Sequence, residues 1–554
     1  MALRAAPVFA CLVFATILAP YRDLVPFWDA REYAECVLNA TQGRFDPLQL
    51  NCMGHPTMLY MVFHWAGQEL APFRTEALLV VNVLLGWLGL WSFFRIAQRL
   101  LPSAERMSSP LAGLVTLAFA LHPVFLAAAA FLNPDYGVAV FFLATMACLL
   151  EGRLAWAVVA GTFTVWSKQQ GIVVYGILAS TFFLLRVLSA GAPWRPALRS
   201  SKRLLWLVLP IATFAIYPAL KHYRLIPLPF FEAGGGPGLV ASALTVGSHR
   251  IFVGYLVLVF VLNVAWLPTL VAVSGGVSWL LSVRFRTSRA IHDRLAASEV
   301  FRNRLLVVLV LVASTLVLTR FQTFLNARYF MPLFPLLLLC TLTGVQLLAV
   351  SRVVRALVLG TICLSFASSI WRTSDPVSRA IFGTFEFGDH EMLRMTSLTG
   401  ECCGYGRDQL VYNLEFARFH YLNDAIIHKL SAAKSVPVVV WPDVGWHFFG
   451  PYDVETKRRT LRRDGVHRFR AASAVAVALD EFRFEEFVLL EYPNFRQQSL
   501  LGLFSRRYDV VSAMEFDSLG YRVSALHLKA RPRSAPVSPP LSGARRSGVP
   551  ASRS

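Results

Sequence analysis

The sequence has few charged residues for its length. Only 16% of its 554 residues are Asp, Glu, Lys or Arg, whereas 56% are hydrophobic, and the mean hydropathy is +0.53. Long apolar runs separated by short basic connectors are typical of a polytopic membrane protein. This composition excludes an ordinary soluble enzyme.

Several patterns that carry chemistry are also missing. The eight cysteines form no CxxC pair and have no His/Cys spacing of a metal site. No fixed-period repeat is visible, and nothing in the region after Trp371 resembles a nucleotide loop. No Ala-x-Ala site follows the first apolar run, residues 5–20, so we interpret this run as an uncleaved signal anchor. Cys36 and Cys52 could pair if their loop faces an oxidising compartment.

The net charge of +20 indicates which kind of anionic partner the chain binds. The arginines concentrate in connectors instead of forming a stripe with interleaved aromatic residues, which argues against nucleic acid as a partner. We interpret the charge as positive-inside bias together with affinity for anionic membrane lipid.

The apolar runs predict a mainly α fold, a polytopic helical bundle over residues 1–371 with about 11 spans. The run 251–283 is too long for one straight helix, and we expect Pro268 and Gly275-Gly276 to break it. With the N-terminus inside, the basic connectors fall on the inner side. The same topology places these polar residues on the outer face: Asp29, His55, Asp135, Lys168, Arg320 and Arg328.

The composition after Trp371 changes to that of a soluble domain. We expect an α/β domain on the outer face over residues 372–530, followed by a disordered Pro/Ser/Arg/Gly tail at 531–554. Its predicted elements are buried strands at 436–441 and 487–492, a helix at 408–430 and a hairpin at 508–528.

An acidic stretch, Pro26 to Glu35, follows the first apolar run directly. A carboxylate within one turn of a membrane segment is costly to keep dry, so it lies at the interface or faces a polar cavity. If residues 29–41 form a short helix along the membrane surface, Asp29, Glu32 and Tyr33 share one face. The alternative is a solvated amphipathic connector without chemistry.

This stretch carries a resemblance. The string Asp29-x-x-x-Tyr33-Ala34-Glu35, followed by Gly54-His55-Pro56-Thr57, resembles the first external loop of the GT-C membrane glycosyltransferases, in particular the lipid A aminoarabinose transferases and the protein O-mannosyltransferases. The resemblance implies that Asp29 is the catalytic acid. The family has a second acid directly after the first, whereas this sequence has Ala30, which leaves Glu32 as the substitute candidate.

Two further stretches resemble landmarks of the same family. One is a lysine after a span, Lys168, and the other is Arg-Tyr-x-x-Pro at the head of a late span, beginning at Arg328 and Tyr329. A transferase that uses a lipid-phosphate sugar needs a base for the acceptor hydroxyl and cations for the departing phosphate. The candidate substrate-binding residues are Tyr33, His55, Lys168, Arg320, Arg328 and Tyr329. The alternative for the cations is snorkelling to lipid headgroups.

Asp135, in Asn133-Pro134-Asp135, matches the second-loop acid of the family and completes the catalytic candidates with Asp29 and Glu32. It could orient the acceptor or Asp29, or it could cap the helix that follows. No cofactor is expected. A divalent metal held by Asp29, Glu32, Asp135 and His55 remains open, because their spacing neither requires nor forbids it.

The sequence thus predicts a glycosyltransferase that moves a monosaccharide from a polyprenyl-phosphate donor to an envelope glycan, lipid or protein acceptor. The expected location is a bacterial inner membrane, with the site and the C-terminal domain periplasmic. The alternative is a multispan transporter or flippase for a lipid-linked or anionic substrate. Transporters commonly place charges near the bilayer midplane, whereas the conspicuous charges here lie at outer helix ends, which favours interfacial chemistry.

Overall fold

The computed structural model describes most of residues 2–371, with gaps that include 190–201, 227–248, 284–294 and 322–326. After Trp371 it describes these segments: 375–382, 384–387, 390–393, 414, 438–440, 452–453, 458–459, 466–468, 485–491, 501–505, 507–518 and 521–531.

Helices account for nearly all of the described chain up to Trp371. The α-helices are α1 (Ala2–Leu18), α2 (Asp29–Gln42), α3 (Met58–Leu70), α4 (Thr75–Leu100), α5 (Ser103–Arg106), α6 (Leu111–Ala120), α7 (Pro123–Ala130), α8 (Pro134–Leu150), α9 (Leu154–Val165), α10 (Gln169–Ser189), α12 (Leu209–Phe214), α13 (Ile216–His222), α15 (His249–Phe260), α16 (Trp266–Val283), α18 (Glu299–Phe321), α19 (Leu333–Leu347) and α20 (Arg352–Ser369). Short 3-10 helices are η1 (Ala19–Tyr21), η2 (Pro47–Leu50), η3 (Cys52–Gly54), η4 (Lys202–Val208) and η5 (Ala327–Phe330).

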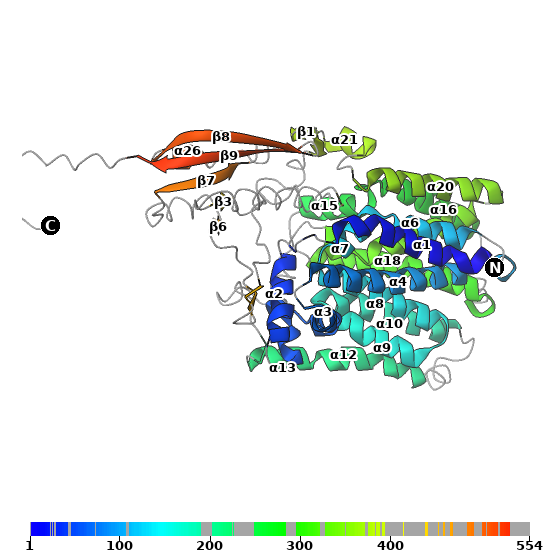
Figure 1. The fold of residues 1–554 in the computed structure, drawn as a ribbon. Coiled ribbons are helices and arrows are strands. Elements are labelled where there is room, and N and C mark those ends of the chain that lie inside the picture. The colour runs from blue at the N-terminus through cyan, green and yellow to red at the C-terminus, as the bar shows by residue number, and fades with distance from the viewer. Residues whose placement is uncertain are drawn as a thin grey trace, which may run out of the picture.

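The long helices form one bundle. α4 packs against α1, α6 and α8, α8 packs against α9, α10 packs against α18, and α16 packs against α19. The amphipathic helix α2 runs across the ends of these helices, so we call this end the α2 end (Figure 1). The N-terminus lies at the opposite end (Figure 1).

The bundle contains helices suited to a membrane. Within the described residues, five are long and apolar enough to cross one, or six if the bent pair α6 and α7 counts as a single span, and further apolar helices are shorter. The expectation of a mainly α, multi-pass membrane protein is confirmed. The number of about 11 spans stays a prediction, because length and hydropathy alone do not assign the shorter helices.

The predicted break in the run 251–283 lies at a different place. The chain leaves the helix at residues 261–265, between α15 and α16, where Asn263 (φ 54°) and Val264 (φ 63°) have positive φ. Pro268 is the third residue of α16, in the first turn where proline is tolerated, and Gly275-Gly276 lie inside that helix. The expectation that Pro268 and the glycines break the run is therefore wrong.

Gly275 has a packing role instead. A Cβ on Gly275 would lie 2.2 Å from the Cα of Gly344 in α19, whereas a Cβ on Gly276 would meet nothing within 4 Å. The hydroxyl of Thr341 donates to the carbonyl of Pro268 at 3.0 Å in the same crossing. Small residues let helix backbones approach closely in membranes, so Gly275 and Gly344 fix the contact between α16 and α19.

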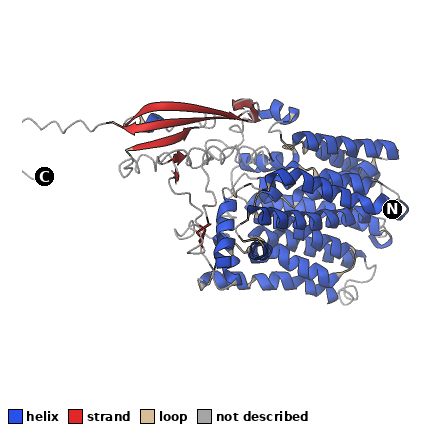
Figure 2. Cartoon of the chain, viewed as in Figure 1, coloured by secondary structure: helices blue, strands red, loops and turns tan. Residues whose placement is uncertain are grey.

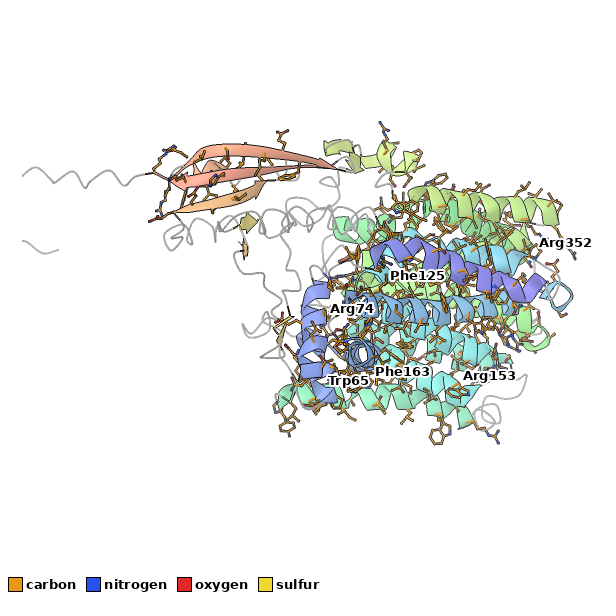
Figure 3. All side chains as sticks on the ribbon, in the orientation of Figure 1. Trp65, Arg74, Phe125, Arg153, Phe163 and Arg352 are labelled. Carbon is orange, nitrogen blue, oxygen red and sulfur yellow. A yellow bond between two sulfur atoms is a disulfide. The ribbon has the colours of Figure 1, made fainter. Side chains whose placement is uncertain are left out.

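Basic side chains tie helices together at the end opposite α2. Arg304 of α18 donates to the carbonyl of Leu100, which ends α4, at 3.0 Å and to Gln346 of α19 at 2.7 Å. Gln346 in turn donates to Glu105 at 3.1 Å. Figure 3 shows Arg153 and Arg352 toward this end as well. Cations here satisfy C-terminal carbonyls and fit the positive-inside pattern.

After α20 come α21 (Pro376–Phe382) and the strands, of which β7, β8 and β9 extend beyond the α2 end of the helices (Figure 2). The strands are β1 (Thr384–Phe387), β2 (His390–Leu393), β3 (Val438–Val440), β4 (Tyr452–Asp453), β5 (Arg458–Arg459), β6 (Val466–Arg468), β7 (Glu486–Glu491), β8 (Tyr508–Ser518) and β9 (Tyr521–Ala530), with the short helix α26 (Leu501–Phe504) between β7 and β8.

One mixed sheet has the order β6-β3-β7-β9-β8, in which β3 pairs in parallel with β6 and β7, and β9 pairs antiparallel with β7 and β8. The strands expected at 436–441 and 487–492 and the hairpin at 508–528 are thus present as β3, β7 and β8–β9. Nearly all of the helix expected at 408–430, and residues 532–554 of the tail, lie outside the described residues. The domain boundaries at 371 and 530 stay a prediction.

Candidate active site at the α2 end of the bundle

Asp135 lies at the start of α8, with its side chain fully buried. The residue at the N-cap position is Asn133, and no side chain there makes a capping hydrogen bond. The Asp135 carboxylate instead receives donors from the α9–α10 connection. The alternative that Asp135 caps the helix that follows it is therefore wrong. Its surroundings are those of a buried counter-ion.

Lys168 supplies one of those donors. It lies in the turn between α9 and α10, is 5% exposed, and its Nζ is 2.7 Å from Oδ2 of Asp135. The amide of Gln170 donates to the other carboxylate oxygen. The ammonium also lies 4.9 Å from the ring centroid of Tyr329. A lysine in apolar surroundings needs an anionic partner, and Asp135 is that partner.

Arg328 reaches the same carboxylate from a third part of the chain. It belongs to η5, directly before α19, and is 6% exposed. Its Nε lies 3.9 Å from Oδ2 of Asp135, and its Nη1 donates to Oδ1 of Asn133 at 3.1 Å. The guanidinium also packs over Tyr329, 5.2 Å from the ring centroid. Two buried cations thus share one carboxylate.

His55 is placed next to this group by contacts with residues that neighbour Lys168. Its Nδ1 is 2.6 Å from the side-chain nitrogen of Gln169, the residue after Lys168. The hydroxyl of Tyr217 donates to the carbonyl of Gly54, and the amide of Leu59 donates to the carbonyl of Trp166 at 3.3 Å. The 54–59 segment is therefore fixed against the turn that carries Lys168.

Helix α2 is joined to the same segment. A disulfide links Cys36 of α2 to Cys52 of η3, so the pairing anticipated for an oxidising compartment is present. The backbone places Asp29 at the start of α2, one helical turn from Tyr33, which is buried. The structure describes the backbone of Asp29 and Glu32 but not their side chains, so the orientation of these side chains stays a prediction.

Asn82 of α4 supports the start of α8 from within the bundle. Its Oδ1 accepts from the hydroxyl of Tyr60 at 2.8 Å, its Nδ2 donates to the carbonyl of Ala129 at 2.9 Å, and its carbonyl accepts from the hydroxyl of Tyr136 at 2.9 Å. Buried polar groups that are all satisfied make a network rigid. Since Tyr136 follows Asp135, the network holds α3, α4, α7 and α8 in register behind the carboxylate.

The structure therefore brings together Asp135, Lys168, Arg328 and Tyr329, with His55 next to them. Arg320 is exposed in the last turn of α18, unlike the two buried cations. Among the described side chains, no group of three or more His, Cys, Asp or Glu could hold a metal ion. Two of the four residues considered for such a site, Asp29 and Glu32, have side chains outside that set.

Sequence reasoning missed the neutral partners Asn133, Gln169 and Gln170, as well as Asn82. The signal that could have found Asn82 is a lone amide within the apolar run of α4, because a polar residue inside a membrane helix needs a partner there. The two glutamines open α10 directly after Lys168, which is the same signal at a helix end.

No protein-family model matches the sequence, and no curated protein matches it. Among solved structures, the chain is similar to ArnT from Cupriavidus metallidurans in the apo state, with 14% identity and a TM-score of 0.51 over 95% of this chain and 98% of that one. The chain has the GT-C fold.

Two other structures are similar over nearly the whole chain. ArnT from the same organism bound to undecaprenyl phosphate has 14% identity and a TM-score of 0.49, covering 94% of this chain and 97% of that one. The Archaeoglobus fulgidus oligosaccharyltransferase in complex with Zn and sulfate has 12% identity and a TM-score of 0.43, covering 94% and 73%. The GT-C resemblance inferred from the sequence is confirmed at the level of the fold, which rests on the apo ArnT comparison.

Proposed function

We propose that the protein is a membrane glycosyltransferase that moves a monosaccharide, a hexose or a pentose, from a polyprenyl-phosphate donor to an envelope glycan, lipid or protein acceptor. The observation that carries the proposal is the buried group of Asp135, Lys168 and Arg328 at the α2 end of a GT-C fold. A lysine and an arginine held next to each other are suited to bind an anionic ligand such as a phosphate.

In this proposal the cations bind the donor phosphate. The phosphodiester of a polyprenyl-phosphate sugar carries one negative charge, which both cations attract. Arg328 offers a planar fork suited to phosphate oxygens, and Lys168 adds a point charge. When the bond between the sugar and the phosphate breaks, the phosphate gains charge, and fixed cations stabilise that charge most in the transition state. Arg320, which is exposed, is proposed to contact the donor phosphate where the donor enters the site.

Asp135 keeps both cations in place, because its Oδ2 accepts from Lys168 at 2.7 Å and lies 3.9 Å from Nε of Arg328. We therefore assign its part in catalysis to orienting Lys168 and Arg328. Tyr329 packs against both cations and limits their motion. His55 and Tyr33 are the proposed contacts for the sugar or the acceptor.

Asp29 is the proposed general base, with Glu32 in support. It would take the proton of the acceptor hydroxyl while that oxygen attacks the anomeric carbon and the phosphate leaves from the opposite side, so the configuration inverts. The carbon–oxygen bond to the acceptor forms as the bond to the phosphate breaks. No metal or other cofactor enters this scheme.

The proposed location is a bacterial inner membrane with the α2 end, and the region after Trp371, in the periplasm. Disulfides persist in oxidising compartments, and the link between Cys36 and Cys52 lies at this end.

The experiment is an assay of purified protein with radiolabelled polyprenyl-phosphate sugars and an extract of envelope glycans. Asp29→Asn keeps the shape but cannot accept the proton, so we expect turnover to fall by roughly 10²–10⁴ with little change in donor affinity. Lys168→Ala and Arg328→Ala should weaken donor binding as well as turnover, because they remove charge that meets the phosphate in the ground state.

Arg352→Ala, at the opposite end of the bundle, is the matched control and should leave both quantities unchanged. Movement of labelled lipid across vesicles without cleavage of any sugar–phosphate bond, over a broad donor panel, would contradict the proposal in favour of a transporter. An Asp29→Asn protein that turns over at the wild-type rate would remove this acid from the mechanism.

A further inference from the structure

Asp375, the first described residue after Trp371, is a buried carboxylate that the proposed reaction does not use. Its Oδ1 accepts from the backbone amides of Val377 and Ser378, each at 3.1 Å, which makes it the N-cap of α21. A cap alone needs only one oxygen. The second oxygen, Oδ2, accepts from the hydroxyl of Ser378 at 2.5 Å and from the backbone amide of Val264 at 3.3 Å.

Asp375 therefore binds the break between α15 and α16. Besides the amide of Val264, the indole nitrogen of Trp266, at the start of α16, donates to Oδ1 at 3.1 Å. Val264 has φ 63°, a conformation that is a genuine outlier for a β-branched residue and persists only where the surroundings hold it. The acceptor of both hydrogen bonds, from Val264 and from Trp266, is a carboxylate about 110 residues away in sequence. The region after α20 therefore stabilises the break.

The break in turn fixes α15, and α15 contacts the turn that carries Arg328. Tyr255 of α15 is buried and lies 5.2 Å, between ring centroids, from Phe330, which is also buried. Phe330 belongs to η5, in which the amide of Met331 donates to the carbonyl of Arg328 at 3.2 Å. A displacement of α15 would therefore displace Phe330, two residues from the guanidinium that meets Asp135.

We propose that Asp375 is a positioning residue that couples the region after α20 to Arg328, through the strained break at 261–265 and the contact between Tyr255 and Phe330. Two rigid contacts in series carry the coupling, and both are buried. The binding part of the test rests on the proposed role of Arg328 in holding phosphate, whereas the backbone part does not.

The decisive variant is Asp375→Asn. Asparagine is an equally good N-cap, so α21 keeps its cap. The amide has only one acceptor oxygen, so the bond from Val264 is lost when that oxygen caps α21. Ser378→Ala removes a donor to Asp375 without touching the break, and serves as the matched control.

Hydrogen exchange measured on matched detergent samples should show faster exchange at residues 262–267 and at 329–331 in Asp375→Asn, and wild-type exchange there in Ser378→Ala. Binding of undecaprenyl phosphate, used as the probe, should weaken about tenfold, the effect expected when one hydrogen bond to a charged group is lost. A second variant, Trp266→Phe, removes the indole donor alone and should give a smaller change in the same direction.

Faster exchange at 262–267 with unchanged exchange at 329–331 would overturn the coupling. Unchanged exchange at both segments would show that Asp375 is a cap and nothing more. If the wild-type protein binds no undecaprenyl phosphate at all, the proposed function fails, but the exchange at 329–331 still decides whether Asp375 acts on the Arg328 turn.

Discussion

The group of Asp135, Lys168 and Arg328 places three charges where water is excluded. Removing one partner of a buried ion pair is costly because the other charge stays behind without compensation, whereas replacing both by apolar groups is often neutral. A structural ion pair and a ligand site therefore respond differently to the same substitutions, and stability can be separated from binding.

Asp135→Asn leaves both cations without their carboxylate, so we expect it to destabilise the protein by about 3–5 kcal/mol. Adding Lys168→Met should restore part of this stability, since methionine fills a similar volume without charge and only Arg328 is then left without the carboxylate. The double variant should still bind polyprenyl phosphate poorly. Thermal unfolding in detergent and donor binding, measured on both single variants and on the double variant, form the cycle.

If the double variant recovered stability and donor binding together, the group would be purely structural. Recovery of neither would show that the fold requires the ion pair itself.

The charged members of this group could be predicted from the sequence, and their neutral partners could not. Asp135, Lys168 and Arg328 stand out because charges beside apolar runs are rare. Asn133 reaches Arg328 across 195 residues, and a neutral amide gives no comparable signal. The resemblance of the first loop predicts a role for Asp29, which stays a prediction, whereas the supporting bonds of Asn82 depend on packing between four helices.

Among the secondary-structure elements, hydropathy predicted where helices occur but not where the longest run breaks. Proline and glycine are the usual breakers, which pointed to Pro268 and Gly275-Gly276. The break at 261–265 is apolar apart from Asn263 and is stabilised from residue 375, so no local pattern reveals it. The glycines serve a contact with α19 that a single sequence cannot show.

This contact leads to a test with an internal control. In Gly275→Ala the added methyl would lie 2.2 Å from a backbone atom of Gly344, so α16 and α19 must separate, and we expect a loss of about 1–3 kcal/mol in stability. Gly276→Ala meets nothing within 4 Å and, as an exchange of glycine for alanine inside a helix, should be neutral or slightly stabilising.

Thermal unfolding of the two variants in the same detergent is the measurement. Equal unfolding temperatures for Gly275→Ala and Gly276→Ala would show that the two helices do not depend on this close approach.

For the whole molecule, a contact joins the first and the last segments of the chain that forms the bundle. The indole of Trp371, after α20, donates to the hydroxyl of Tyr21, after α1, at 2.8 Å. Residue 371 therefore lies at the same end as the start of α2, whichever side of the membrane that end faces. The basic 284–304 connector leads into α18, whose first turn lies near Arg99 at the opposite end.

An alkaline-phosphatase fusion after Trp371 should accordingly be active outside the cytoplasm, and a fusion within 284–304 inactive. A fluorescent reporter that matures only in the cytoplasm should give the reverse pattern at the two positions. An inactive phosphatase after Trp371, with the fusion protein expressed at normal levels, would contradict the proposed orientation of the site.

The disulfide between Cys36 and Cys52 has a consequence for biogenesis. It joins the helix that begins with Asp29 to the segment that is fixed beside Lys168, and in the proposed orientation it can form only after the first loop has been exported. The helix that begins with Asp29 would then be tied to the Lys168 side of the site only where an oxidant reaches the first loop. The supply of oxidant outside the membrane would set how many copies carry this link.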